Sequence, residues 1–309
     1  MKAPRFLLAA CISLALAFTF SCSSDSSDDP TPVQSSSSDG GSSSSSAEEP
    51  ASSSSAVPQH VLTINIEPTA DGTVLRNPAK DAYDHGTVVT VTAEPEFGHE
   101  FTGWVGAATG TNNPIEITMD GNKELTANFA QLMSGSFTDP RDSKTYEWVR
   151  IGGEVWMAQN LNYNAAGSKC YDNSESNCET YGRLYNWATA MDVCLPDWHL
   201  PSEAEWDALT TAVGGTGTGG RTGAGAKLKA TSGWSSGNGT DDFGFSALPG
   251  GHGYSNGSFD LVGDNGYWWT SSERNSDYAY NRFMYGSGSN VYFGSNGKGG
   301  LHSVRCVLD

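Results

Sequence analysis

The chain has 309 residues, a formal net charge of −18 and 37% hydrophobic residues. Nucleic-acid binding depends on clustered Lys and Arg side chains that face phosphates, and this sequence has no basic block, so we expect no nucleic-acid partner. A surface this acidic also disfavours direct docking on anionic lipid.

Residues 1–22 have the features of a secretory signal peptide. Lys2 and Arg5 form a positive start, and a mostly apolar run follows over residues 6–20. The run is too short to span a membrane, and no later run reaches the length of about 18 apolar residues that spanning needs. We therefore expect export without a transmembrane helix.

Cys22 at the end of this segment suggests a bacterial lipoprotein, in which Cys22 becomes the acylated first residue. Thr19 and Phe20 depart from the usual Leu-plus-small pair before such a cysteine, and Cys11 would leave too short an apolar segment. Ordinary cleavage that releases a secreted protein is the alternative. We predict a lipid-anchored protein of the outer membrane that faces the cell exterior, with the acyl chains as its only membrane contact.

Residues 23–58 form a low-complexity linker. They include 17 serines and six acidic residues but no Lys or Arg. Such a segment cannot bury enough apolar surface to offset its ordering entropy, so we expect it to be disordered. It would hold the folded parts away from the membrane.

Residues 59–131 have the texture of a small antiparallel β-module. Short runs rich in β-branched residues alternate with turn residues, a pattern typical of strands. The runs are residues 61–66, 87–93, 114–119 and 125–129. Gly86-Thr87-Val88-Val89-Thr90, Phe101-Thr102-Gly103-Trp104 and the last run resemble the divergent internalin B-repeat, a non-catalytic β-module used in surface proteins as a spacer or in adhesion. We expect Trp104 to lie in the core of this module.

Residues 132–309 hold eight of the nine tryptophans. The alternating segments 144–151 and 154–160 flank Gly152-Gly153, which predicts a two-residue hairpin. Ser202 and Glu205 have the spacing of a capping box, which predicts a helix that Gly214-Gly215 ends. A second short helix is expected near residues 184–191. Strands are expected again over residues 267–270, 279–285, 290–293 and 302–307.

Seven stretches of this segment carry a second resemblance. They include Trp198-His199-Leu200-Pro201 and Tyr267-Trp268-Trp269-Thr270, and together they cover residues 135–142, 151–161, 181–187, 198–206, 243–251, 267–272 and 303–307. They resemble the Fibrobacter succinogenes major paralogous domain. The resemblance implies an α+β fold similar to C-type-lectin-like domains and formylglycine-generating enzymes, on secreted or lipid-anchored proteins. It implies no agreed activity, and the reactive cysteine pair of those enzymes is not matched here.

Four cysteines remain after the signal segment, and an even number in an exported domain indicates two disulfides. Three pairings are possible. We favour Cys170–Cys178, which closes a short polar loop, and Cys194–Cys306, which ties the last strand to the segment before the main helix. No zinc spacing is present, so we expect no metal centre of that kind.

Four aspartates could offer oxygen ligands to Ca²⁺, and solvated turn acids are the simpler interpretation of the same residues. They are Asp241, Asp242, Asp260 and Asp264. We therefore expect no obligatory cofactor, with Ca²⁺ as the one candidate.

Several aromatic residues lie among Gly, Ser and Asn, a mixture that is typical of adaptable contact surfaces. They are Trp234, Tyr254, Phe259, Tyr278, Tyr285 and Tyr292. We predict a non-catalytic binding or adhesion protein whose rings recognise carbohydrate, such as plant cell-wall polysaccharide, or a surface protein. The alternatives are a structural envelope component without a ligand and an enzyme with an unrecognised site.

Overall fold

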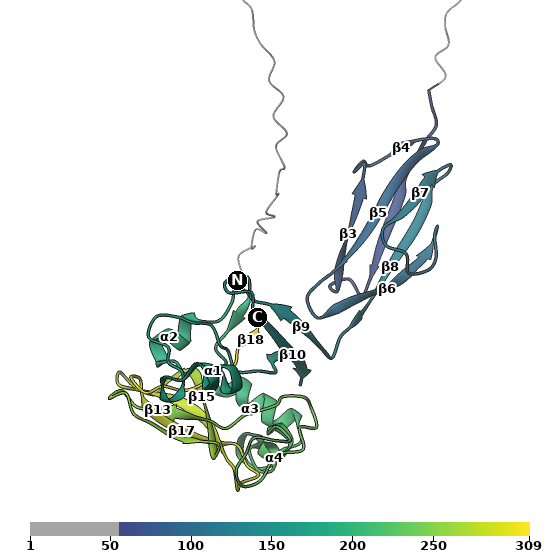
Figure 1. Cartoon of the computed structure of the whole chain (residues 1–309). Coiled ribbons are helices and arrows are strands. Elements are labelled where there is room, and N and C mark those ends of the chain that lie inside the picture. The colour runs from purple at the N-terminus through teal and green to yellow at the C-terminus, as the bar shows by residue number, and fades with distance from the viewer. Residues whose placement is uncertain (1–55) are drawn as a thin grey trace, which may run out of the picture. The chain divides into compact units, whose positions relative to one another are not determined.

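The computed structural model describes residues 56–309 (Figure 1). The predicted signal segment, the acylation site at Cys22 and nearly all of the serine-rich linker lie outside the described residues. Within residues 56–309 no helix combines the length and the apolar character needed to cross a membrane.

The segment that follows the linker is built from strands alone, as predicted. Its strands are β1 Gln59–His60, β2 Leu62–Glu67, β3 Gly72–Asn77, β4 Tyr83–Asp84, β5 Thr87–Pro95, β6 His99–Gly106, β7 Ile115–Met119 and β8 Lys123–Gln131. Two three-stranded sheets, in the orders β2-β8-β6 and β3-β5-β7, enclose one apolar core. Val89, Val91 and Ala93 alternate with less buried neighbours along β5, and Trp104 is buried, which confirms its predicted place in the core.

The prediction of a purely antiparallel module is wrong at one pair. β2 and β8 run parallel, with Leu62 opposite Lys123 and Glu67 opposite Asn128. The period-two pattern identifies each segment as a strand, but it carries no information about the direction of its partner. Parallel partners need a long connection, and here the five intervening strands β3–β7 provide it.

The remaining residues form a mixed α+β domain. Its strands are β9 Ser134–Thr138, β10 Thr145–Ile151, β11 Glu154–Met157, β12 Trp198–His199, β13 Gly250–Gly253, β14 Phe259–Val262, β15 Asn265–Glu273, β16 Tyr278–Tyr285, β17 Tyr292–Gly297 and β18 Val307–Leu308. Its helices are α1 Glu175–Tyr181, α2 Trp187–Asp192, α3 Glu203–Ala212 and α4 Ala224–Leu228, with short 3₁₀ turns at Tyr171–Asn173 and Thr218–Gly220. The strands make two five-stranded sheets, in the orders β12-β18-β11-β10-β9 and β14-β13-β15-β16-β17.

The predicted hairpin is present between β10 and β11. Ile151 is opposite Glu154, so Gly152 and Gly153 are the two turn residues, and both have positive φ angles, of 66° and 95°. Glycine adopts this backbone conformation without the steric cost that a Cβ atom adds. The local sequence was therefore sufficient to predict both the turn and its register.

Helix α3 begins with the predicted capping box. The Ser202 hydroxyl accepts a hydrogen bond from the Glu205 amide at 3.3 Å, and the Ser202 amide donates to the Glu205 carboxylate at 2.6 Å. The apolar face of the helix buries Trp206 and Leu209 in a core cluster that includes Trp156 and Trp268. The helix therefore packs on one face of the β15–β16 pair.

Both predicted disulfides are confirmed. Cys170 bonds Cys178 and Cys194 bonds Cys306, with Cα–Cα distances of 5.0 and 5.9 Å. The second bridge joins positions 112 residues apart, so it ties the last strand region to the segment before α3. Helices α1 and α4 were not predicted; α1 lies partly inside the short disulfide loop.

Candidate functional site

The sheet β14-β13-β15-β16-β17 has two faces of different character. Trp268 and Met284 point from one face into the core beneath α3. Tyr267 and Phe283 alternate with these residues along β15 and β16, and Tyr292 on β17 is opposite Phe283; all three lie on the opposite face, where they are only partly buried. The pattern follows from the two-residue period of β-strands.

The three rings on this face lie in one register line across three strands. Tyr267 is opposite Phe283, and Phe283 is opposite Tyr292. The ring centroids are 5.5 and 5.4 Å apart, and the ring planes differ by only 27° and 15°. Cross-strand aromatic pairs of this kind stabilise a sheet and also make a continuous apolar surface.

The line continues at both ends. Beyond Phe283 and Tyr292, the Tyr285 ring lies 5.2 and 5.0 Å from theirs and is 39% exposed. On the other side His252 lies 4.8 Å from Tyr267 and 4.7 Å from Tyr254, which is 45% exposed. We call the set Tyr254, His252, Tyr267, Phe283, Tyr292 and Tyr285 the aromatic row.

The row is in contact with a second, buried histidine through its own His252. His302 is fully buried, with its ring centroid 5.9 Å from that of His252 and 4.2 Å from that of Trp269. Burial, with a smaller effect from the neighbouring His252, lowers the pKa of His302 to about 3. Burial also lowers the pKa of His252. Both rings are therefore neutral at pH 7, and they support the row as uncharged packing groups.

A pocket of about 560 Å³ adjoins the Tyr254 end of the row. Phe259 and Leu301 line it with apolar surface, and the Phe259 ring packs on Tyr171 at 5.3 Å. The remaining lining is polar or small: Gly167, Lys169, Asn173, Asn186, Tyr254, Ser255, Gly257, Lys298 and Gly299. This volume lies within the usual range of small-ligand sites.

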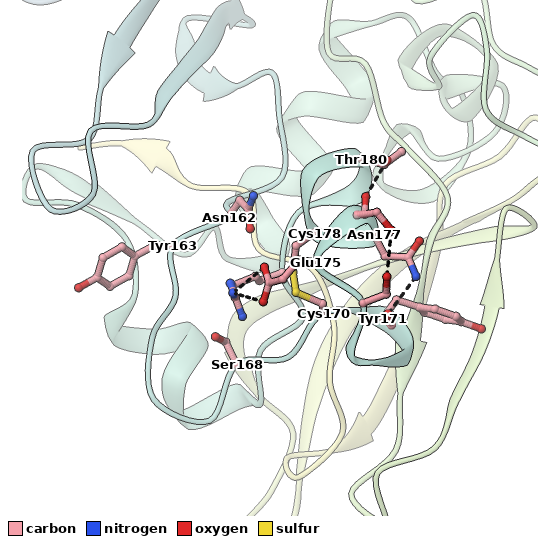
Figure 2. The surroundings of a disulfide bond; sticks show 12 residues. Asn162, Tyr163, Ser168, Cys170, Tyr171, Glu175, Asn177, Cys178 and Thr180 are labelled. Atoms are coloured by element: carbon pink, nitrogen blue, oxygen red, sulfur yellow. Dashed lines mark hydrogen bonds and ion pairs between the residues drawn. A yellow bond between two sulfur atoms is a disulfide. The ribbon is translucent and has the colours of Figure 1, made fainter.

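The disulfide Cys170–Cys178 (Figure 2) joins α1 to the loop that carries Lys169 and Asn173, two residues that line this pocket. Cys170 lies between Lys169 and Tyr171, and its partner Cys178 is buried in α1. The Asn177 amide donates to the Tyr171 carbonyl at 2.9 Å, which ties the same loop to the helix. Glu175 lies beside the two sulfurs, but a disulfide offers no thiolate to a metal, so this group is a structural staple in its oxidised form.

The structure separates the predicted site residues into groups. Tyr254, Tyr285 and Tyr292 belong to the row, and Phe259 lines the pocket. Tyr278 is 46% exposed at the start of β16, and among the described rings no stacking contact joins it to the row. Its contact with a ligand stays a prediction.

Trp234 requires a correction. It is only 5% exposed, its indole nitrogen donates to the Ala247 carbonyl at 3.0 Å, and the Lys229 ammonium lies 4.9 Å from its ring centroid. The glycine- and serine-rich neighbours of Trp234 indicated an exposed loop, but the ring itself turns into the core. Burying the large apolar surface of the indole ring is favourable, and the polar character of the neighbouring loop residues does not outweigh this gain in free energy.

The four candidate Ca²⁺ ligands are not brought together. Asp241 accepts hydrogen bonds from the amide and the hydroxyl of Ser246, and Asp264 accepts one from Ser235. Asp260 on β14 is opposite His252 on β13. In the described part of the chain, none of the four belongs to a group of three potential metal ligands.

Three rings and two lysines of the site were not predicted from the sequence. His252, Tyr267 and Phe283 complete the row, and Lys169 and Lys298 line the pocket. A signal existed in the alternation of Phe283 and Tyr285 along one strand, since residues two apart share a face. The strand register that aligns them with Tyr267 is not visible in the sequence.

Comparison with protein families matches residues 149–308, just over half of the chain, to the Fibrobacter succinogenes major domain. The chain belongs to this family. Residues 62–132 match the divergent InlB B-repeat domain. No curated protein and no solved structure matches the chain. The aromatic row and its pocket both lie within the Fibrobacter succinogenes major domain.

Proposed function

We propose that the Fibrobacter succinogenes major domain of this chain is a non-catalytic recognition module that binds carbohydrate through the aromatic row and the adjoining pocket. The observation that carries the proposal is the continuous line of six rings, which has an exposed tyrosine at each end and adjoins, at its Tyr254 end, a pocket with apolar and polar lining. Sugar rings combine C–H faces with hydroxyl edges, so they fit a surface that combines aromatic rings with hydrogen-bonding groups.

The side chains at the pocket favour binding over hydrolysis. Glycoside hydrolysis commonly uses two carboxyl groups that flank the bond to be broken. The titratable side chains among the described residues that line this pocket are Lys169, Lys298 and Tyr254. We further propose a C-type-lectin-like arrangement for the domain, in which loops and a curled sheet present the ligand surface.

The proposal also includes the predicted location of the protein. Acylation at Cys22 would anchor the protein in the outer membrane with its folded parts facing the exterior, where polysaccharide or a surface protein is accessible. The two disulfides support an exported location, because such bonds persist in oxidising compartments.

A binding comparison of two single variants tests the proposal. Tyr254→Ala removes an exposed ring from the row, and Phe293→Ala removes a ring that is 55% exposed on β17 next to Tyr292 but on the opposite face of the sheet. We expect polysaccharide retention in affinity gel electrophoresis to fall for Tyr254→Ala and to persist for Phe293→Ala. Equal retention of both variants, or no retention of the unmodified protein by any polysaccharide, would refute carbohydrate binding by the row.

A further inference from the structure

The pocket beside Tyr254 differs in charge from the chain that carries it. The protein has 35 acidic and 17 basic side chains. Of the described residues that line the pocket, two are lysines and none is Asp or Glu. A cationic recess on an acidic protein attracts an anion locally, while the rest of the surface repels it.

The two lysines have different surroundings. Lys298 forms an ion pair with Glu273, and its ammonium lies 4.5 Å from the Trp187 ring centroid, so part of its charge is already compensated. Lys169 is exposed, its backbone pairs with Leu184, and no ion pair involves its ammonium within residues 56–309. The Lys169 charge is therefore available to a ligand.

The side chain of Asn186, which also lines the pocket, offers hydrogen-bond donors as well. The Asn186 side-chain oxygen already accepts a hydrogen bond from the Thr189 amide at 2.9 Å, whereas its side-chain NH₂ group makes no hydrogen bond within residues 56–309. An ammonium and an amide NH₂ are both donors, and a carboxylate offers only acceptors. Lys169 and Asn186 thus suit a carboxylate.

From this geometry we infer that the pocket binds an acidic sugar, a uronic-acid unit whose carboxylate faces Lys169 and whose ring lies against Tyr254 and Phe259. The inference rests on the proposed function and names the class of saccharide. The disulfide Cys170–Cys178 holds the Lys169 segment in place, so the cation is presented by a fixed loop.

The test uses a pair of ligands that differ by methyl esterification, which removes the charge of the carboxylates. Oligogalacturonate carries a carboxylate on each unit, and its fully methyl-esterified form is neutral. We expect isothermal titration calorimetry to show binding of the acid form that weakens as salt rises, and binding of the ester that is weaker by at least about threefold.

Variants at one position separate charge from fold. Lys169→Ala should weaken binding of the acid form to about the level of the ester, and Lys169→Arg should retain it. Lys80→Ala, which removes an exposed lysine from the β-module, is the matched control and should leave affinity unchanged.

The outcomes distinguish the two proposals. Equal affinity for the acid and the ester, or unchanged affinity in Lys169→Ala, overturns the assignment of an acidic sugar but leaves carbohydrate binding intact if Tyr254→Ala still abolishes it. Absence of binding to either oligosaccharide overturns the acidic-sugar assignment. Carbohydrate binding by the row then stands if affinity gel electrophoresis shows retention by a neutral polysaccharide, and it falls if no polysaccharide retains the protein.

Discussion

Lys229 places a positive charge inside the domain without a carboxylate to balance it. The residue is 2% exposed, and its ammonium donates to the carbonyls of Gly237, Gly286 and Gly288 at 2.6, 2.8 and 2.9 Å, with the carbonyl of Tyr285 also near at 3.3 Å. One side chain therefore joins two loops, and one of these loops follows directly after the Tyr285 end of the aromatic row.

Replacing Lys229 with Met keeps the length and the apolar stem of the side chain but removes the ammonium. The Gly286 carbonyl would lose its donor in buried surroundings, whereas the other carbonyls can partly recover water. Hydrogen bonds to a charged group contribute about 1.5–3 kcal/mol each, and removing the buried ammonium recovers some desolvation, so we expect a net loss of about 2–4 kcal/mol.

Urea denaturation measures this loss. With a slope of about 2–3 kcal/mol/M for a domain of this size, the midpoint should fall by about 1 M while the slope stays unchanged. Lys227→Met is the matched control. Lys227 precedes Lys229 by two positions in the chain, and its ammonium has a single carbonyl acceptor, that of Val213 at 2.7 Å. A midpoint for Lys229→Met within error of the control would refute the reasoning.

Three further predictions concern the core, the long disulfide and the pH dependence. Trp234→Ala should cost about 3–5 kcal/mol in urea denaturation because it empties a buried site, and a small cost would contradict its place in the core. Replacing both Cys194 and Cys306 with Ala should lower stability by up to about 4.8 kcal/mol on the chain-entropy estimate, and unchanged stability would argue against the bridge. Burial lowers the pKa of His199, but hydrogen bonds to Glu205 and Asp309 outweigh it, so the pKa is raised overall. The stabilisation by His199 should therefore be complete below its ordinary pKa and be lost as pH rises through the raised value, and NMR titration together with the loss of this pH dependence in His199→Gln checks it.

Local patterns predicted the parts of the fold that depend on a few neighbouring residues. The hairpin at Gly152-Gly153 follows from the alternating residues 144–160, and the capping box at Ser202 follows from residues three positions apart. The disulfide pairing was favoured because one bridge closes a short polar loop and the other ties the last strand to the segment before α3. Helix α4 was missed because its five residues lie in a glycine-rich segment that offers no period. The parallel partner of β2 was missed because strand direction is decided by chain topology.

The candidate site was only partly visible in the sequence for a related reason. Tyr254 and Tyr285 were recognised because they stand in polar, glycine-rich surroundings. Tyr267 and Phe283 lie in patterned strands, where a neighbour such as Trp268 suggests that every ring is buried. Which face a ring occupies depends on register between strands far apart in the chain, and Trp234 shows the reverse error, a loop residue whose ring is buried.

The parallel alignment of β2 and β8 has a mechanical consequence for the β-module. Because these strands point the same way, the chain enters at one end of their shared ladder and leaves toward the other. A pull on the two ends of the module would act along the strands and load all six register pairs in shear at once, instead of opening them one after another. Resistance to such a force is set by the rate of unfolding. The module therefore has the connectivity of a force-bearing element.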